Sequence, residues 1–123
     1  MTSSKLEDAR VLPRRPARAA EAWTRSYADP IQVAAGERVR FSGRIDIWDG
    51  CEWRWAAAAD GREGWLPDWL CDADDRARIA YETGELSVAV GEIVQASPVQ
   101  HGWRWCAGAA GEGWVPARLL EEI

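Results

Sequence analysis

The chain has 123 residues and a net charge of −5, and it is long enough for one ordinary domain or two very small ones. It contains nine tryptophans but only one Phe and one Met. The acidic balance argues against a nucleic-acid-binding protein, and no apolar run is long enough for a transmembrane helix.

The predicted elements are short strands that follow a basic tail. Residues 1–16 are expected to form a disordered basic tail, and only residues 17–22 have the character of a helix. Alternating Ile and Val at residues 31–33 predict a strand that leads into a turn. Asp60-Gly61 is a hairpin signal, and residues 113–116 predict a strand that ends at a proline. Short strands with frequent turns indicate an all-β protein.

Three segments of the first half recur in the second half. The first-half segments are 33–37, 53–55 and 63–67, and their counterparts are 88–92, 103–105 and 112–116. The first copy is five residues longer in the connection before its Trp-Arg-Trp segment, and loops tolerate such differences. The repeat predicts two tandem copies of a small β-barrel or sandwich, the first copy over residues 17–72 and the second copy over residues 76–123. The resemblance given below implies barrels.

The cysteines and the N-terminus bear on the compartment. Cys51, Cys71 and Cys106 are an odd number without clustering, which is typical of reduced thiols in a cytoplasmic protein. The N-terminus has no apolar segment like that of a secretory signal. We therefore expect a cytoplasmic protein that binds neither membranes nor nucleic acid.

The second copy resembles the Src homology 3 (SH3) family. The resemblance lies in an ordered set of short motifs, which are Ala77-Arg78-Ile79-Ala80-Tyr81, Glu85-Leu86-Ser87-Val88, Gly91-Glu92-Ile93-Val94, Gly102-Trp103, Gly113-Trp114-Val115-Pro116 and Leu119-Leu120. The first copy matches more loosely, with residues 19–23 in the place of the first motif. The tandem, tryptophan-rich form is similar to bacterial variant SH3 proteins.

The resemblance implies a shallow aromatic groove that binds extended, proline-rich and basic peptides. In the second copy the matched positions are Tyr81, Glu85, Trp103, Trp114, Pro116 and Leu119. In the first copy they are Trp23, Asp29, Trp53, Trp65 and Pro67. Ile79, Leu119 and Glu21 stand where the family has groove tyrosines, and Glu21 is the larger departure, so the second copy is the expected binding unit.

Other interpretations of these features stay open. The tryptophans of the two Trp-Arg-Trp segments form either an aromatic platform or a cover for the core, and Trp65 and Trp114 line the groove or lie buried between the barrels. Residues 13–18 match a PxxPxR ligand motif, although a basic tail running into the first strand is the simpler interpretation. Self-association through this motif is one expected outcome.

No pattern in the sequence indicates an enzyme. There is no Gly-rich phosphate loop, no paired metal-ligating His and no nucleophile elbow, and the chain has a single His. We therefore expect no catalytic residue, no cofactor and no metal. The expected function is a non-catalytic module that binds a protein or peptide. The alternatives are a module that binds cell-wall glycans and a structural subunit with vestigial grooves.

Overall fold

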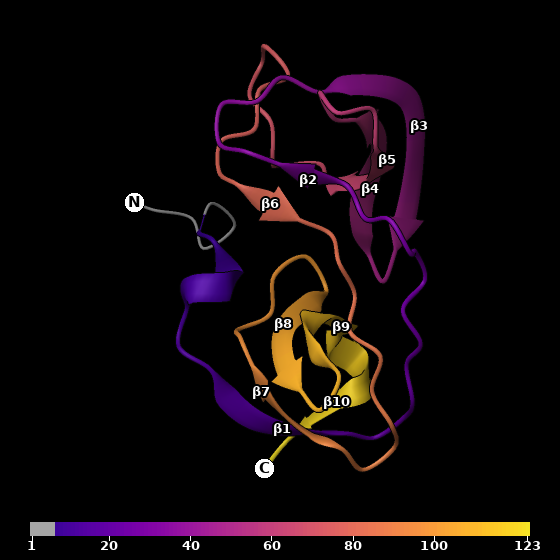
Figure 1. Cartoon of the computed structure of the whole chain (residues 1–123), viewed down its shortest axis with the longest axis vertical. Helices are drawn as coiled ribbons and strands as arrows, with labels where there is room; N and C mark the ends of the chain where they lie inside the picture. Colours follow the sequence, from indigo (N-terminus) through magenta and orange to yellow (C-terminus); the bar gives the residue numbers. More distant parts are fainter. Residues whose placement is uncertain (1–6) are drawn as a thin grey trace. The chain divides into compact units, whose positions relative to one another are not determined.

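Short β-strands make up almost all regular structure in the computed structural model, which describes residues 7–123 (Figure 1). In chain order the elements are η2 (Ala9–Val11), β1 (Arg15–Ala19), β2 (Gln32–Val33), β3 (Arg40–Trp48), β4 (Cys51–Ala57), β5 (Glu63–Pro67), β6 (Tyr81–Glu82), β7 (Ile93–Ala96), β8 (Trp103–Gly108), β9 (Gly111–Pro116), η3 (Ala117–Leu119) and β10 (Leu120–Glu122). The expected all-β class is therefore confirmed.

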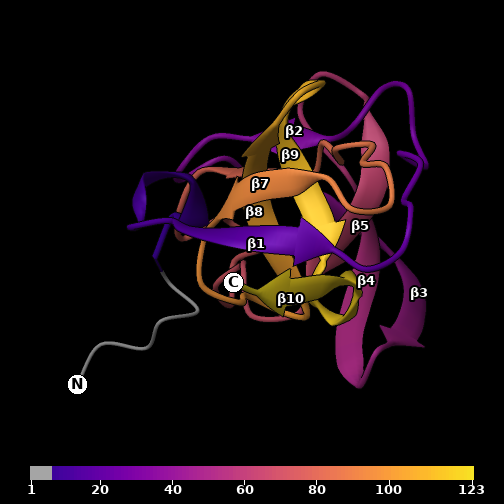
Figure 2. The ribbon, with the colours of Figure 1, turned by 90° about the horizontal axis from the view of Figure 1, so that it is seen from below.

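The strands of the described residues form three sheets. One sheet has the order β10-β1-β7-β8-β9, the second pairs β2 with β6, and the third has the order β3-β4-β5. None of them closes on itself into a barrel. Figure 2 shows β1 between β7 and β10, which are its two antiparallel neighbours.

The described chain divides into two compact units that differ from the tandem boundaries expected from the repeat. Unit 1 contains Asp29–Thr83, together with residues 7–8, and unit 2 contains Ala9–Ala28 and Gly84–Ile123. Residues 17–28, which were expected in the first domain, therefore belong with the second copy. Residues 76–83, which were expected in the second domain, belong with the first copy.

Backbone hydrogen bonds place the first segment of each copy in the other unit. In unit 2, the N–H of Ala19 donates to the carbonyl of Glu92 at 2.9 Å, and Ala19 accepts from the N–H of Gly91 at 2.7 Å. These two hydrogen bonds join β1, which comes from the first copy, to the Gly91-Glu92 turn of the second copy.

Unit 1 repeats this arrangement with the copies interchanged. The N–H of Ala77 donates to the carbonyl of Glu37 at 2.9 Å, and the N–H of Gly36 donates to the carbonyl of Ala77 at 2.7 Å. Ala77 thus occupies in unit 1 the position that Ala19 occupies in unit 2. The two copies have exchanged their first segments within one chain.

Strand β1 corrects two expectations about the N-terminal part of the chain. Ala17 and Ala19 are fully buried while Arg18 between them is exposed, so the expected helix over residues 17–22 is wrong because the alanines alternate as in a strand. Part of the expected disordered tail is also ordered. Its residues 1–6 lie outside the described residues, but η2 and β1 begin within it.

The ordered part of the tail is held by a single arginine and a buried alanine. Arg14 donates to the carbonyl of Arg10 at 3.1 Å and to the Glu112 carboxylate at 2.9 Å. Ala9 in η2 is only 1% exposed. These contacts explain why a segment of disorder-prone composition adopts a defined conformation.

Each unit has its own apolar core. The core of unit 2 consists of Ala17, Ala19, Leu86, Val88, Val94, Ala96, Cys106 and Val115. In unit 1 the buried apolar side chains include Ile31, Val39, Leu66 and Leu70. Both cores are small, so each unit depends on the segment that it receives from the other copy.

The hairpin predicted at Asp60-Gly61 forms, since this turn joins β4 to β5, and a second, tighter hairpin joins β3 to β4. Asp49 and Gly50 both have positive φ, at 50° and 78°, and join β3 to β4 as a two-residue turn. A two-residue hairpin turn with positive φ at both positions favours Asn, Asp and Gly. Gly61 also has a positive φ of 90°, but it lies in a longer connection in which the N–H of Ala58 donates to the carbonyl of Arg62.

Candidate binding site

An aromatic and acidic cluster lies on unit 2, where Trp23, Glu85 and Trp103 meet. The Trp23 and Trp103 rings are 5.7 Å apart between centroids and meet edge to face at 81°. The indole N–H of Trp23 donates to Glu85 Oε1 at 3.0 Å. All three side chains are half-buried, which leaves part of their surface available to a ligand.

The exchanged segment brings Trp23 to this place. Trp23 exchanges both backbone hydrogen bonds with Val88, at 3.0 and 2.9 Å. The backbone N–H of Ser26 then donates to Glu85 Oε1 at 3.0 Å. Two donors from the segment of the first copy therefore fix an acid of the second copy.

Glu85 is positioned from the other side by strand β9. It forms a parallel bridge with Trp114, and the N–H of Trp114 donates to the carbonyl of Gly84 at 2.9 Å. Gly113 permits this close approach, because a Cβ there would lie 2.7 Å from the backbone carbon of Glu85. The Gly of the Gly-Trp-Val-Pro segment is thus required by the site.

Trp103 begins β8, directly after a tight turn. His101 and Gly102 have φ values of 52° and 84°, and Gln100 and Trp103 close the turn through backbone hydrogen bonds. Pro116 of β9 is the partner of Trp103 in the strand register. Trp103 is partly exposed, but its indole nitrogen is buried.

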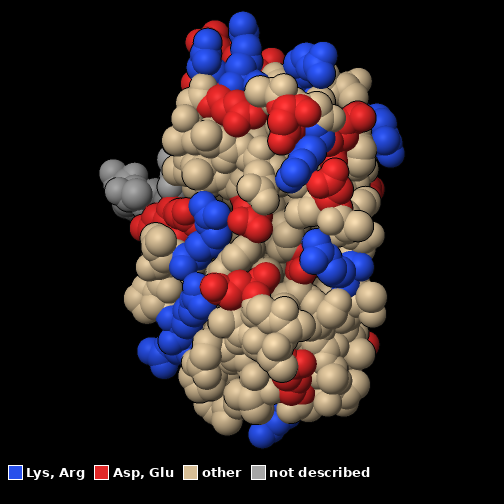
Figure 3. All heavy atoms as spheres, viewed as in Figure 1, with Lys and Arg blue, Asp and Glu red and all other residues tan. Residues whose placement is uncertain are grey.

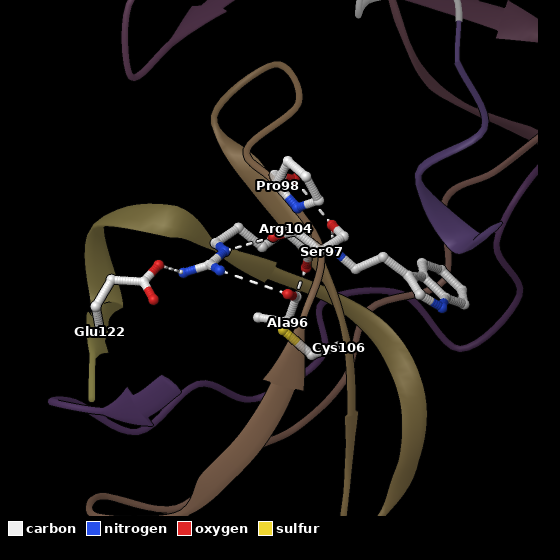
Figure 4. Close-up of polar contacts among 7 residues, drawn as sticks. Ala96, Ser97, Pro98, Arg104, Cys106 and Glu122 are labelled. Carbon is white, nitrogen blue, oxygen red and sulfur yellow. Dashed lines mark hydrogen bonds and ion pairs between the residues drawn. The ribbon is translucent and has the colours of Figure 1, made fainter. Parts of the chain in front are cut away.

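A buried arginine stabilises the strands on which Trp103 stands (Figure 4). The Arg104 guanidinium donates from Nε to the carbonyl of Ser97 at 2.6 Å and from Nη1 to Glu122 at 2.8 Å. The Ser97 hydroxyl accepts from the backbone N–H of Trp105 at 2.8 Å. This network links the end of β7 to β8 and to β10.

Three of the six predicted positions of the second copy are inside unit 2 rather than on its surface. Trp114, Pro116 and Leu119 are all buried. Trp114 packs edge to face against Trp105, which is also buried, with ring centroids 5.4 Å apart. These three residues therefore belong to the interior of unit 2 and do not form an exposed binding surface.

The Trp105 indole also serves a structural purpose. It donates to Glu112 at 3.2 Å, and this bond, together with the Arg14 guanidinium, holds the pKa of the Glu112 carboxyl below its usual range. Trp105 therefore covers the core, which was one of the two interpretations of the second Trp-Arg-Trp segment.

Tyr81 lies in unit 1, whereas Glu85 and Trp103 lie in unit 2. It pairs with Val33, and its ring meets Trp69 at 6.1 Å and 87°. The side chain is only 5% exposed, and burial raises the pKa of its hydroxyl far above the usual range. Trp23 takes in unit 2 the place that sequence reasoning assigned to Tyr81.

The remaining predicted positions of the first copy are spread over unit 1. Trp53 is half-buried opposite the buried Pro67, as Trp103 is opposite Pro116 in unit 2. Asp29 is exposed and forms an ion pair with Arg62 at 3.3 Å. Asp29 pairs with Arg62, whereas its counterpart Glu85 contacts Trp23, so the cluster of unit 2 is the better candidate site.

Trp65 belongs to a second aromatic cluster that includes a residue missed by sequence reasoning. Its ring meets Trp55 at 5.1 Å and 76°, and the Arg44 guanidinium lies 5.3 Å from Trp65 and 5.0 Å from Trp55. Such contacts between a cation and aromatic rings are attractive. Arg44 lies next to a β-bulge in β3, and no short motif signals that geometry.

The surface charge, the grouping of possible metal ligands and the helices of the described residues bear on the kind of ligand that the protein could bind. On the face in Figure 3, acidic and basic side chains are interspersed instead of forming one continuous acidic field. No group of three or more His, Cys, Asp or Glu in residues 7–123 is arranged to hold a metal ion. Within the same residues, no helix is long and apolar enough to cross a membrane.

Comparisons of the chain with family models, with curated proteins and with solved structures give no match.

Proposed function

We propose that the protein is a non-catalytic interaction module built from two SH3-like units, and that unit 2 binds short basic, proline-rich peptides. The order of short motifs in the sequence supports the family assignment. The fold adds that each unit contains the first segment of the other copy, as the contacts of Ala19 and Ala77 indicate. In this proposal, the two small barrels are interleaved instead of being arranged in simple tandem.

One observation carries the proposal: the half-buried Trp23 contacts both the Trp103 ring and the Glu85 carboxylate. Two aromatic rings at a steep angle provide a shallow surface against which a proline ring packs. An extended proline-rich chain loses little conformational entropy on docking. Its Arg or Lys side chain is the natural partner of the Glu85 carboxylate.

Both contacts to Glu85 from within the chain use the same oxygen, Oε1. The carboxylate is therefore oriented before a ligand arrives, while its second oxygen can accept a hydrogen bond from a guanidinium. Preorganisation of this kind reduces the entropy lost on binding. We propose Glu85 as the specificity residue, with Trp23 and Trp103 as the contact surface.

The experiment is an amide NMR titration of the full chain with Arg-containing proline-rich peptides. We expect shifts at Trp23, Glu85 and Trp103 that grow with peptide concentration. Trp103→Ala should abolish them, and Glu85→Gln should weaken binding roughly tenfold, since a charge-assisted hydrogen bond contributes ~1.5–3 kcal/mol.

Trp53→Ala is the matched control, because Trp53 has the same place in unit 1 as Trp103 has in unit 2. It should leave the titration unchanged. If the spectrum of the native chain does not respond even at millimolar peptide, the proposal fails. If Trp53→Ala and Trp103→Ala weaken binding equally, unit 2 is not the principal site.

A structural subunit is the second candidate function, and the burial of Trp105, Trp114 and Leu119 favours it. In that case the aromatic residues stabilise unit 2, and the exposed parts of Trp23 and Trp103 contact no peptide. Trp103→Ala would then lower the free energy of unfolding, and no peptide would shift the spectrum of the native chain. The titration and a urea denaturation therefore separate the two candidates.

A further inference from the structure

The first copy has a long hairpin that the second copy lacks. Strand β3 has nine residues, whereas its counterpart β7 has four. The additional residues extend the hairpin of β3 and β4 as far as the Asp49-Gly50 turn. Because unit 2 is complete without such an extension, the extension has a role other than forming the core.

Strand β3 is an edge of its sheet. Among the described residues, β4 is the only strand that pairs with β3, so one side of β3 has no strand beside it. An edge strand of this length presents N–H and C=O groups to which another strand can bond.

The side chains on this edge strand include two exposed isoleucines. Ile45 is 57% exposed and Ile47 is 61% exposed, and both point to the same face of the hairpin. Their partners on β4 are Arg54 and Glu52, which form an ion pair with each other at 2.8 Å. Two adjacent exposed isoleucines on an edge are an uncommon feature of a monomeric surface.

We propose that β3 is a self-association surface that pairs antiparallel with β3 of a second copy of this chain, with the two-fold axis at Ile45. In this register Ile45 faces Ile45 of the second copy, and Arg44 faces Asp46 at two symmetric positions. Both charged residues are exposed. The dimer therefore joins a central apolar pair to two opposite-charge pairs, as an isologous interface permits.

The charges distinguish this register from its neighbours. A slip of one residue in the register would turn every side chain to the other face. The competing registers are therefore those in which the two-fold axis moves by one whole residue, which changes the register by two. An axis at Asp46 places two carboxylates opposite each other, and an axis at Arg44 places two guanidinium groups opposite each other. Like charges directly opposite are destabilising, so the charges disfavour these two neighbouring registers.

The bulge limits the extent of the interface. The register of β3 with β4 shifts between Phe41 and Ile45, and Gly43 has a φ of 89°. Regular pairing about Ile45 therefore covers only Arg44, Ile45 and Asp46 of each chain. An interface this short buries far less than the ~1,200 Å² of a stable complex, so the dimer should form only at high protein concentration. This inference goes beyond the proposed peptide binding and does not depend on it.

The test is sedimentation equilibrium and amide NMR of the full chain over a wide range of concentration. We expect the average mass to rise from that of the monomer toward that of the dimer, with amide shifts confined to residues 44–48. Arg44→Asp alone and Asp46→Arg alone should each weaken association at least about fivefold, since each creates two like-charge pairs. The double variant R44D/D46R should restore it.

Arg44 also lies against two tryptophans, so the double variant guards against a purely local effect of its loss. A second variant, Ile45→Lys, should abolish association, whereas the control Ile93→Lys should not, because Ile93 is a similarly exposed isoleucine on β7. A chain that stays monomeric at millimolar concentration overturns the proposal. So does an R44D/D46R variant that associates no better than the single variants.

Discussion

Trp23 and Tyr81 occupy equivalent positions in the two repeats, and each pairs with a valine of the other repeat. Trp23 bridges Val88, and Tyr81 is paired with Val33. The two aromatic residues nevertheless have different surroundings, because Trp23 is half-exposed beside Glu85 while Tyr81 is buried. Because the exchange of first segments places Trp23 in unit 2, the candidate site lies on that unit.

The first prediction concerns fragments of the chain. A fragment of residues 29–83 contains the continuous part of unit 1 and should fold on its own. A fragment of residues 76–123, which the repeat would suggest as a domain, lacks β1 and should not fold, because β1 lies between β7 and β10. Circular dichroism and amide NMR measure both outcomes.

The control for the fragments is a chain that joins residues 9–28 directly to residues 84–123 through a short flexible linker. It restores β1 to its sheet and should recover the folded spectrum of unit 2. If residues 76–123 fold alone as well as this joined chain does, the stability of unit 2 does not depend on the first segment of the first copy.

The second prediction concerns Gly113. Its substitution by Ala places a Cβ 2.7 Å from backbone atoms of Glu85 and Leu86, which cannot move aside as a flexible side chain can. We expect a loss of roughly 1–3 kcal/mol in the free energy of unfolding, which is the usual cost of overpacking. We also expect weaker peptide binding, because Glu85 is displaced.

Gly64→Ala is the equivalent change in unit 1, where the close atom belongs to the side chain of Ile31. It should destabilise the chain without changing peptide binding. Equal losses of binding in the two variants would contradict the placement of the site on unit 2. Urea denaturation and the NMR titration together provide the comparison.

The third prediction compares two arginines at the same place in the repeat. Arg104 has only 8% of its side chain exposed and bonds the carbonyl of Ser97 as well as Glu122. Replacing it by Ala should cost roughly 2 kcal/mol, because buried carbonyl groups lose their donors. Arg54 is 46% exposed and forms an ion pair with Glu52 on the surface, so Arg54→Ala should change stability by less than about 1 kcal/mol.

Thermal and urea denaturation measure this difference. A cost for Arg54→Ala as large as that for Arg104→Ala would show that the network around Ser97 contributes nothing beyond a surface ion pair.

The fourth prediction concerns alkaline pH. Burial raises the pKa of the Cys106 thiol to about 12 and that of Cys71 to about 11, from an ordinary value of 9.0. Because the folded state binds these protons more tightly than the unfolded state, their contribution to stability is complete below pH 9. It is lost as the pH rises from 9 toward 12.

The measurement is the free energy of unfolding from urea denaturation at a series of pH values from 8 upward. Cys106→Ala should lower stability at pH 8 but make its decline above pH 9 less steep. Cys71→Ala should likewise make the decline less steep, because burial also raises the pKa of the Cys71 thiol. A slope that is the same in the native chain and in Cys106→Ala would contradict the prediction.

The sequence predicted the all-β class and the strands of the two repeats, because alternation of apolar residues and turn-forming Gly are local signals. The partners of the first segment of each copy could not be predicted in the same way. Ala19 and Ala77 make the same backbone hydrogen bonds, so the pairing pattern itself does not favour one copy over the other. Contacts of particular side chains, such as Trp23 with Glu85, distinguish them.

The candidate site was predicted in part for the same reason. Glu85 and Trp103 lie together on unit 2, but Tyr81 is replaced there by Trp23, which was assigned to the other copy. Trp114 matched the family position and is nevertheless buried, since its partner in the strand register is Trp105. A pattern of residue types does not show which tryptophans of a strand pair are buried.

The insertion of unit 1 between two parts of unit 2 has a consequence for synthesis on the ribosome. Residues 29–83 emerge as one continuous stretch, so unit 1 can fold while the rest of the chain is still being made. Unit 2 must wait, because Arg14 meets Glu112, 98 residues later, and β1 pairs with the final strand. Strand β1 is made early but is thus among the last elements to pair, and unit 2 should fold more slowly than unit 1.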